Sequence, residues 1–218
     1  METGKATVLL VDSQPIVRRG GASLINGSKH FKVAGEAGSA TQALQLAERL
    51  QPRVVLMELL LDGVIAVGLI PKILEKSPRS GILIFSTQND ATFAHRALRE
   101  GANGYILKQE SPTRILAALR RALEGKTYLS PQILKRMLYY YADAKSDGGG
   151  ENRFCKLSDR ELQIFRLIGS GLNIRQIAEK LSLERKTIDT YCSRIKKKLD
   201  VETLSELTRE AIRWSPEL

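Results

Sequence analysis

The run VVLMELLLDG, residues 54–63, carries the clearest signal for the fold of the first part of the chain. Its first four residues are apolar, and a short apolar run that ends at polar residues and a turn signal is typical of a buried strand. The strand delivers Glu58 and then Asp62 into the loop that follows it. In doubly wound α/β proteins, ligands bind beyond the carboxyl ends of the strands. The first question is therefore what a glutamate does at this position.

Strand-like and helix-like patterns alternate five times around this stretch. The predicted strands cover residues 7–11, 31–36, 54–57, 82–85 and 104–107. The predicted helices cover residues 15–25, 40–50, 67–76, 91–100 and 112–124. Alternation of this kind favours a parallel sheet with helices on both faces. We expect an α/β domain with a five-stranded, parallel, doubly wound sheet of the flavodoxin-like type.

Composition divides the chain into three parts, of which the sheet pattern occupies residues 1–127. Ser130 and Pro131 have the N-cap and first-turn positions of a sixth helix. Residues 142–153, ADAKSDGGGENR, hold no apolar side chain larger than alanine, so they bury too little surface to order themselves. We therefore expect an extra helix and a Gly-rich flexible linker over residues 128–153, and a second domain over residues 154–218.

The second domain is predicted to be all-α, with four helices. Capping-box spacings mark the starts of its first and last helices, at Ser158 with Glu161 and at Thr203 with Glu206. Between them lie a short predicted helix, residues 173–181, a tight connection and a longer helix, residues 185–199. A short helix, a turn and a longer basic helix form the helix-turn-helix plan.

The longer helix has a core-facing stripe and an opposite polar face. At 100° per residue, one arc collects Ile188, Tyr191, Cys192, Ile195 and Leu199. The run RKTIDTYCSRIKKK, residues 185–198, holds six basic residues and one acid. Short polar side chains flanked by cations suit a helix in the major groove, because Thr and Ser allow close approach to base edges while Lys and Arg neutralise phosphates. The alternative is an ordinary solvated face.

This domain resembles the DNA-binding domain of the LuxR-type helix-turn-helix regulators. Residues 157–199, LSDRELQIFRLIGSGLNIRQIAEKLSLERKTIDTYCSRIKKKL, follow that family's pattern. The resemblance implies a sequence-specific DNA-binding regulator with Lys186, Thr190, Ser193, Arg194 and Lys197 at the DNA surface. Thr187 and Asp189 of the same helix are further candidate DNA contacts. It also implies a homodimer on two-fold symmetric double-stranded DNA, formed through Leu204, Leu207, Thr208 and Ala211. The alternative for these four residues is that they only close the domain's own core.

Polar residues end four of the predicted strands, and they converge on one rim of the sheet. They are Asp12, Glu58, Ser86 and Lys108. In a doubly wound sheet of this order, the ligand site lies between the first and third strands. With this rim and the C-terminal motif together, residues 6–125 resemble the receiver domain of two-component response regulators, and the whole chain resembles the NarL/FixJ family.

The resemblance implies a phosphate site of which this chain keeps only part. In the family, two adjacent acids after the first strand hold Mg²⁺, and an aspartate after the third strand becomes phosphorylated. The chain keeps Asp12, Ser86, Tyr105 and Lys108. It has Ser13 in place of the second acid, Glu58 in place of the acceptor aspartate, and Asp62 where a proline is common.

These replacements predict a receiver that works without phosphate. Ser13 removes a charge from a site that needs oxygen ligands, so Mg²⁺ binding should be weak or absent. Glu58 is longer by one methylene, and in-line phosphoryl transfer is sensitive to a displacement of that order. We expect its carboxylate to reach toward Lys108 and Ser86 instead. The alternatives are a plain structural ion pair, and competition from Asp62 for Lys108.

Two other functions stay open from the sequence. One is a conventional phosphorylated response regulator or metal-dependent phosphoryl-transfer enzyme that uses Asp12, Glu58 and Asp62. The other is a protein-interaction module that docks on another regulator protein through its receiver. His30 and His95 are isolated and no residue set is typical of a hydrolase, so we expect a protein that is not an enzyme.

Composition sets broader limits. The chain has 218 residues, of which 43% are hydrophobic, and its net charge of +10 favours polyanionic partners. No apolar run approaches the roughly 20 residues that span a bilayer, and the first residues enter a strand pattern without a signal-peptide arrangement, so we expect a cytoplasmic protein with no membrane partner. Cys155 and Cys192 lack metal-ligand spacing and are expected to be free buried thiols. We expect no metal and no other cofactor.

Overall fold

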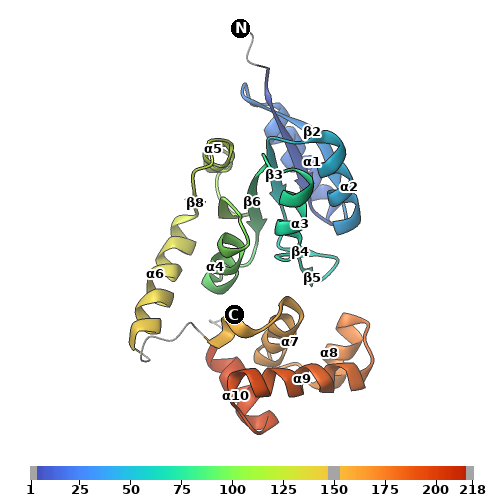
Figure 1. The fold of residues 1–218 in the computed structure, drawn as a ribbon, viewed down its shortest axis with the longest axis vertical. Coiled ribbons are helices and arrows are strands. Elements are labelled where there is room, and N and C mark those ends of the chain that lie inside the picture. Colours follow the sequence, from blue (N-terminus) through green and yellow to red (C-terminus); the bar gives the residue numbers. More distant parts are fainter. Residues whose placement is uncertain (1–3, 147–152, 215–218) are drawn as a thin grey trace. The chain divides into compact units, whose positions relative to one another are not determined.

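A computed structural model describes residues 4–146 and 153–214 of the chain. The chain forms two compact units, Met1–Asp143 and Ala144–Leu218 (Figure 1). The first unit contains the sheet and the second is helical, as predicted. Each unit is described by itself below, as the N-terminal domain and the C-terminal domain.

The N-terminal domain is built on a parallel sheet with the strand order β2-β1-β3-β6-β7-β8. Its strands are β1 Ala6–Val11, β2 Phe31–Ala37, β3 Val54–Met57, β6 Gly81–Ser86, β7 Gly104–Leu107 and β8 Tyr128–Leu129. Five of them are the predicted strands. The predicted number is wrong by one, because β8 adds a sixth strand of two residues beside β7. A pair this short has no periodicity that a sequence pattern could reveal.

The register of the central strands brings their carboxyl ends to one edge. Val11 of β1 pairs with Met57 of β3, so that Asp12 and Glu58 leave the sheet side by side. On the other side of β3, Ser86 of β6 pairs with Leu107 of β7, and Lys108 follows. The predicted polar rim is therefore a consequence of parallel pairing.

Helices cover both faces of the sheet, as expected from the βα alternation. They are α1 Pro15–Asn26, α2 Ala40–Leu50, α3 Leu69–Lys76, α4 Ala91–Arg99 and α5 Pro112–Leu123. Val8 and Leu10 of β1 belong to a core cluster with residues of α1 and α5. Leu9 points to the other face, where it lies with Leu46 and Leu50 of α2 around Gly35. The alternation along β1 is the period of two that a pleated strand imposes.

A small hairpin follows β3 and was not predicted. Its strands are β4 Leu60–Leu61 and β5 Val64–Ile65, which pair antiparallel. The two residues between them, Asp62 (φ 50°) and Gly63 (φ 73°), have left-handed backbone angles. Two consecutive positive φ values make the tight turn that suits an antiparallel pair, and Asp-Gly is one of the dipeptides that adopt it readily. The segment that follows Glu58 in the chain is therefore a hairpin with a defined conformation.

Helix α6, Pro131–Ser146, begins directly after a residue that is hydrogen-bonded to the sheet, a contact that was not predicted. Ser130 is fully buried, and its hydroxyl accepts a hydrogen bond from the Leu107 N–H. The prediction that residues 142–146 are part of a coil is wrong, because α6 continues through them. Ala, Lys and Ser permit a helix that an earlier turn has already nucleated. The rest of the predicted linker, residues 147–152, lies outside the described residues.

The C-terminal domain contains the four predicted helices. They are α7 Asp159–Gly169, α8 Ile174–Leu181, α9 Arg185–Leu199 and α10 Leu204–Trp214, after a short 3-10 helix, η1 Arg153–Lys156. The capping box of Ser158 and Glu161 forms as predicted. Gly169 allows α7 to approach α10, since a Cβ at this position would lie 2.5 Å from the Ala211 carbonyl oxygen. The rings of Phe154, Phe165 and Trp214 pack together with centroids 5.3–5.6 Å apart.

Candidate functional sites

The carboxyl edge of the sheet holds a buried ion-pair cluster centred on Lys108. The Asp12 carboxylate is 1% exposed, and its Oδ2 accepts a hydrogen bond of 2.6 Å from Lys108 Nζ. Its Oδ1 accepts the Gln14 N–H at 2.8 Å. The Arg18 guanidinium donates to the Asp12 carbonyl oxygen at 2.6 Å. Asp12 is therefore held from three directions.

Glu58 pairs with the same ammonium group. Its Oε2 forms an ion pair with Lys108 Nζ, and its side chain is 8% exposed. Its other oxygen, Oε1, accepts the backbone N–H groups of Leu59 at 2.7 Å and Leu60 at 3.2 Å. The longer glutamate side chain thus reaches across to the lysine and also folds back on the start of the β4–β5 hairpin.

The other predicted rim residues lie around this cluster without joining it. The Ser86 hydroxyl accepts the Gln88 N–H, and the fully buried Tyr105 donates its hydroxyl proton to the Gln88 carbonyl oxygen at 2.7 Å. Within the described chain, Glu58 makes no hydrogen bond to Ser86, so that part of the expected contact is wrong. Gln88 was not among the predicted residues, because a sequence pattern does not reveal the backbone groups that bond Ser86 and Tyr105.

Ser13 and Asp62 contribute no charge to the cluster. Ser13 is half-buried, and Asp62 is exposed at the tip of the hairpin. In the part of the chain that the structure describes, Asp62 forms no ion pair with Lys108, so the expected competition does not occur there. Among the described residues, Lys108 forms ion pairs with Asp12 and Glu58.

The cluster does not fit the Mg²⁺ ion that the strand-end acids would otherwise suggest. All four carboxylate oxygens of Asp12 and Glu58 already accept from a backbone N–H or from the Lys108 ammonium. Mg²⁺ requires several oxygen ligands in near-octahedral geometry, and Ser13 offers only a neutral hydroxyl. Among the described residues, no group of three or more His, Cys, Asp or Glu side chains could hold a metal ion.

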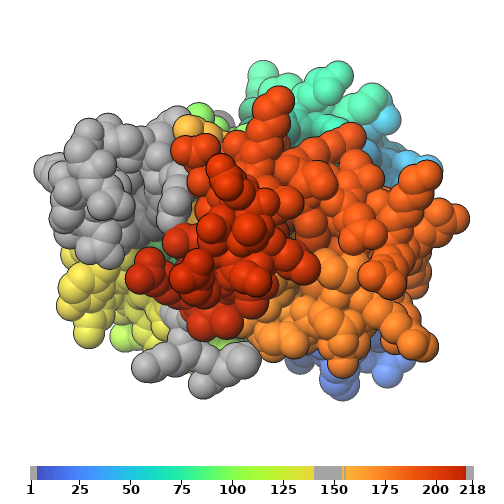
Figure 2. Space-filling view, turned by 90° about the horizontal axis from the view of Figure 1, so that it is seen from below, coloured from blue at the N-terminus to red at the C-terminus, as the bar shows by residue number. Residues whose placement is uncertain are grey.

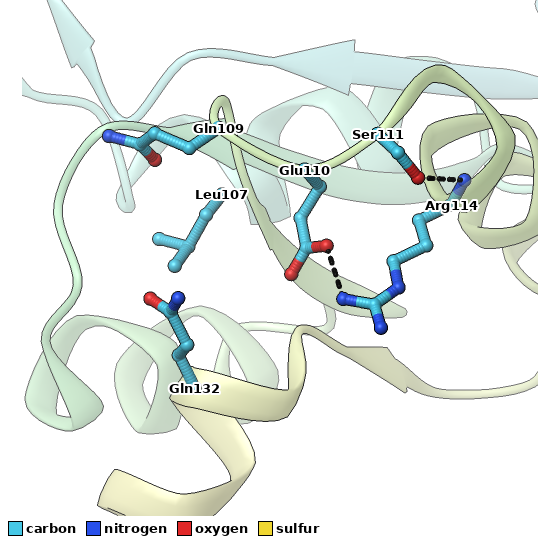
Figure 3. A pocket seen from close by; sticks show the side chains of 6 residues that line it. All are labelled: Leu107, Gln109, Glu110, Ser111, Arg114 and Gln132. Atoms are coloured by element: carbon cyan, nitrogen blue, oxygen red, sulfur yellow. Dashed lines mark hydrogen bonds and ion pairs between the residues drawn. The ribbon is translucent and has the colours of Figure 1, made fainter.

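A polar hollow of about 440 Å³ lies beyond the end of β7 (Figure 3). Its lining residues are Leu107, Gln109, Glu110, Ser111, Arg114 and Gln132. Two of these residues form an ion pair, with Arg114 Nη1 2.9 Å from Glu110 Oε2. This pairing raises the pKa of Arg114. The hollow shares no residue with the Lys108 cluster.

Helix α9 presents the predicted polar face to solvent. The view in Figure 2 looks onto the C-terminal domain, coloured orange to red. Six of the seven predicted DNA-contact residues are exposed, namely Lys186, Asp189, Thr190, Ser193, Arg194 and Lys197. Thr187 is half-buried, so it is less available than predicted. The predicted core stripe is buried at Ile188, Cys192, Ile195 and Leu199, whereas Tyr191 is half-buried.

The exposed face of α9 is ordered by its own side chains. The hydroxyl groups of Thr190 and Ser193 donate to the carbonyl oxygens of Lys186 and Asp189, one turn earlier. The Arg194 guanidinium lies 5.9 Å from the centre of the Tyr191 ring. Small, tethered hydroxyl groups in the middle of a basic face leave room for the close approach of a polyanion.

Cys192 lies on the inner face of α9 as a free, buried cysteine. Burial raises the pKa of its thiol to about 11, with a smaller contribution from the Asp189 carboxylate. The thiol is therefore neutral at physiological pH and acts as an apolar core group. The side chain of Cys155, the other cysteine, lies outside the described part of the structure.

Helix α10 divides the four predicted dimerisation residues into two pairs. Leu207 and Ala211 are fully buried in the domain's own core. Leu204 is 46% exposed, and Thr208, half-buried, lies one turn further along the helix. Ile212 continues the same outward row and is 56% exposed, although it was not predicted. The outward row of α10 therefore consists of Leu204, Thr208 and Ile212.

No helix in the described ranges is both long enough and apolar enough to cross a bilayer.

Comparison with known families assigns both domains. Residues 8–120 match the response regulator receiver domain family, and residues 156–211 match the bacterial regulatory proteins of the luxR family. Among solved structures, a two-component response regulator of the LuxR family from Aurantimonas sp. is 31% identical, with a TM-score of 0.60. The match covers 64% of this chain and 99% of that one. RcsB in its DNA complex has a TM-score of 0.59 over 98% of this chain, and its 23% identity supports the fold alone.

Several named relatives match over nearly the whole length of the chain. The transcriptional activator ExaE of Pseudomonas putida is 30% identical over 94% of this chain and 95% of its own. The nitrate/nitrite response regulator NarL of Escherichia coli is 32% identical over 92% of both chains. The oxygen regulatory protein NreC of Staphylococcus carnosus is 31% identical over 94% of this chain and 96% of its own. The chain therefore belongs to the response regulators of the NarL/FixJ type, DNA-binding transcriptional regulators that join a receiver domain to a luxR-family helix-turn-helix domain.

Proposed function

We propose that this protein is a sequence-specific transcriptional regulator whose receiver works without phosphorylation. One observation carries the proposal: the Lys108 ammonium is bound by Glu58 and Asp12 together. In this arrangement, the Glu58 carboxylate forms an ion pair with the Lys108 ammonium group. That group would otherwise be available to bind a phosphoryl oxygen. The negative charge that phosphorylation would bring is already present as a side chain.

The contacts of Glu58 also disfavour phosphoryl transfer to it. A phosphoryl acceptor needs a free carboxylate oxygen in line with the leaving group. Here Oε2 is bound by Lys108, and Oε1 accepts two backbone N–H groups. Attack on a phosphodonor would require one oxygen to leave its partners. The missing acid at Ser13 removes metal ligation that would help this step.

The DNA-binding part of the proposal rests on α9. Its exposed hydroxyl groups and cations would enter the major groove, with Thr190 and Ser193 near base edges and Lys186, Arg194 and Lys197 near phosphates. A homodimer would place two α9 helices on the half-sites of a two-fold symmetric duplex, about one helical turn apart. The outward row of Leu204, Thr208 and Ile212 on α10 is the surface we assign to that pairing. Such a regulator would act in the cytoplasm, together with the chromosome.

The test is selection of bound fragments from a random duplex pool by the full-length, untreated protein at near-physiological salt, since salt sets how much nonspecific binding survives. We expect a two-fold symmetric site without any phosphodonor. We expect Glu58→Gln to weaken binding to that site, because a neutral amide cannot replace the carboxylate at Lys108. Glu124→Gln is the matched control, because Glu124 pairs with Lys126 at the surface. Equal binding by both variants would contradict the role of Glu58.

A second measurement addresses phosphorylation directly. The protein is incubated with acetyl phosphate and Mg²⁺, and its intact mass is measured. We expect no added phosphoryl group. A stoichiometric mass increase that disappears in Glu58→Gln would show a conventional phosphoacceptor instead.

A further inference from the structure

Three consecutive lysines end the basic run of α9, and they differ in what they contact. Lys196 donates from Nζ to the Glu202 carbonyl oxygen at 3.0 Å, beyond the end of the helix. Lys198 donates to Glu161 Oε2 of α7 at 2.6 Å. Lys197 is exposed, and within the described residues it makes no ion pair. Lys196 and Lys198 thus have partners within the domain, whereas Lys197 extends into solvent.

One carboxylate oxygen of Glu161 accepts two hydrogen bonds. Its Oε2 accepts the Ser158 N–H at 2.6 Å in the capping box and also accepts Lys198. The side chain is 4% exposed, whereas the side chain of Lys198 is 38% exposed. Burial by itself raises the pKa of the Glu161 carboxyl, but the bonds from Lys198 and Ser158 outweigh it and lower the pKa. Glu161 is therefore a buried anion that ties the start of α7 to the end of α9.

Arg160, the residue before Glu161, connects the same turn of α7 to α8, the other helix of the helix-turn-helix pair. Arg160 donates from Nη2 to the Leu181 carbonyl oxygen at 3.4 Å, at the last residue of α8. Its Nη1 donates to Gln163 Oε1 at 2.8 Å, which fixes the guanidinium. Carbonyl groups at a helix end lack partners within the helix, and an arginine is well suited to bind them. Two adjacent residues of one turn thus hold the C-terminal ends of α8 and α9.

We propose that Arg160 and Glu161 form a first-turn clamp that sets the angle of α9 in the DNA groove, and that Lys198 is a positioning residue and not a phosphate contact. The clamp consists of Arg160, Glu161 and their partners, the Leu181 carbonyl and Lys198. The inference rests on the proposed DNA-reading role of α9. It assigns the lysines of the run to separate roles: Lys197 binds phosphate, and Lys198 orients the helix.

The salt dependence of binding separates these roles. The logarithm of the binding constant falls linearly with the logarithm of salt concentration, by about 0.9 for each phosphate that the protein neutralises. Affinity of the full-length protein is measured by fluorescence anisotropy over a range of salt, on the duplex enriched by selection and on a duplex of mixed sequence. We expect Lys197→Gln to reduce the slope by about 0.9 per bound subunit, on both duplexes.

Lys198→Gln should behave differently. We expect it to weaken binding to the enriched duplex roughly tenfold, because α9 loses a charge-assisted hydrogen bond that orients it, and to leave the salt slope unchanged. Its preference for the enriched duplex over the mixed one should fall. Lys198→Arg keeps the charge and the bond, and should retain wild-type affinity. An equal loss of slope in Lys197→Gln and Lys198→Gln, or wild-type affinity in Lys198→Gln, would overturn the clamp.

A measurement on the wild-type protein covers the case in which a variant does not fold. Lysine side chains are labelled with a reductive methylation reagent, with and without the duplex, and each site is quantified by mass spectrometry. We expect the duplex to protect Lys197 and to leave the labelling of Lys198 unchanged. Protection of Lys198 would overturn the clamp while DNA binding by α9 stands. A wild-type chain that binds neither duplex would overturn the proposed function together with the clamp.

Discussion

The Lys108 ammonium lies 2.6 Å from Asp12 Oδ2 and pairs with Glu58 on its other side, and both carboxylates are less than one-tenth exposed. Two buried anions thus depend on one cation. Removal of that cation leaves both carboxylates with backbone N–H donors but without a counter-charge, which is costly in a site that water hardly reaches. The stability of the receiver should therefore depend strongly on this single lysine.

Lys108→Met tests this dependence, because it keeps most of the side-chain volume and removes the charge. We expect a loss of roughly 3–5 kcal/mol in the free energy of unfolding at neutral pH. The measurement is urea denaturation followed by circular dichroism. Lys126→Met is the control, since Lys126 and Glu124 form an exposed pair that solvent screens, so its loss should hardly change the stability. Similar losses in the two variants would contradict a special role for the buried cluster.

The contact between α7 and α10 leads to a second prediction. Gly169→Ala places a Cβ 2.5 Å from the Ala211 carbonyl oxygen, so one helix must move. We expect a loss of about 1–3 kcal/mol in the stability of the C-terminal domain. Gly20→Ala is the matched change on α1, where a Cβ meets nothing within 4 Å. Since alanine favours a helix over glycine, that variant should gain about 0.5–1 kcal/mol.

The raised pKa of Cys192, about 11, predicts an unreactive thiol in the folded protein. Only the thiolate is a strong nucleophile, so iodoacetamide at pH 8 should modify the Cys192 peptide slowly, and fast once urea unfolds the domain. The shift stabilises the fold below the ordinary thiol pKa of 9.0, and this contribution is lost as pH rises through about 11. Rapid labelling of Cys192 under native conditions, detected by peptide mass spectrometry, would show that α9 opens readily.

Local signals in the sequence account for what could be predicted. Both ends of α9 follow from its periodicity and its flanking residues, and the capping box of Ser158 predicted the start of α7. Asp12, Glu58 and Lys108 could be grouped because parallel strands end at one edge. The common feature is that each signal lies within a few residues or follows from a rule of topology.

Features that depend on side-chain conformation or on a distant partner could not be predicted. The turn of Glu58 Oε1 onto the Leu59 N–H depends on a rotamer, and the hydrogen bonds that Gln88 makes with Ser86 and Tyr105 use its backbone. The pairing of Lys198 with Glu161 joins residues 37 positions apart. In contrast, the β4–β5 hairpin could have been predicted, because Asp-Gly between apolar residues indicates a hairpin turn. The signal was missed because Asp62 was interpreted as part of the acidic site at the strand ends.

The lowered pKa of Glu161 makes the C-terminal domain sensitive to acid. Burial opposes the charged form, but the hydrogen bonds from Lys198 and Ser158 overcome it, so the folded pKa lies below the ordinary value of 4.5. A lowered carboxyl pKa stabilises the fold above the unfolded pKa, and this contribution is lost as pH falls from 4.5 through the folded value. Trp214, the sole tryptophan, packs on Phe154 and Phe165 and reports the unfolding of this domain by its fluorescence.

Glu161→Gln should lose roughly 1–3 kcal/mol at pH 7, because a neutral amide replaces the charge-assisted acceptor. The variant should also lose less stability than the wild type between pH 5 and pH 3, since it has no carboxyl to protonate there. Urea titrations of Trp214 fluorescence at several pH values measure both effects. Glu179→Gln is the control, because Glu179 and Arg175 form an exposed pair on α8. Parallel pH profiles for the wild type and Glu161→Gln would mean that another carboxyl group governs the acid response, and the assignment to Glu161 would be wrong.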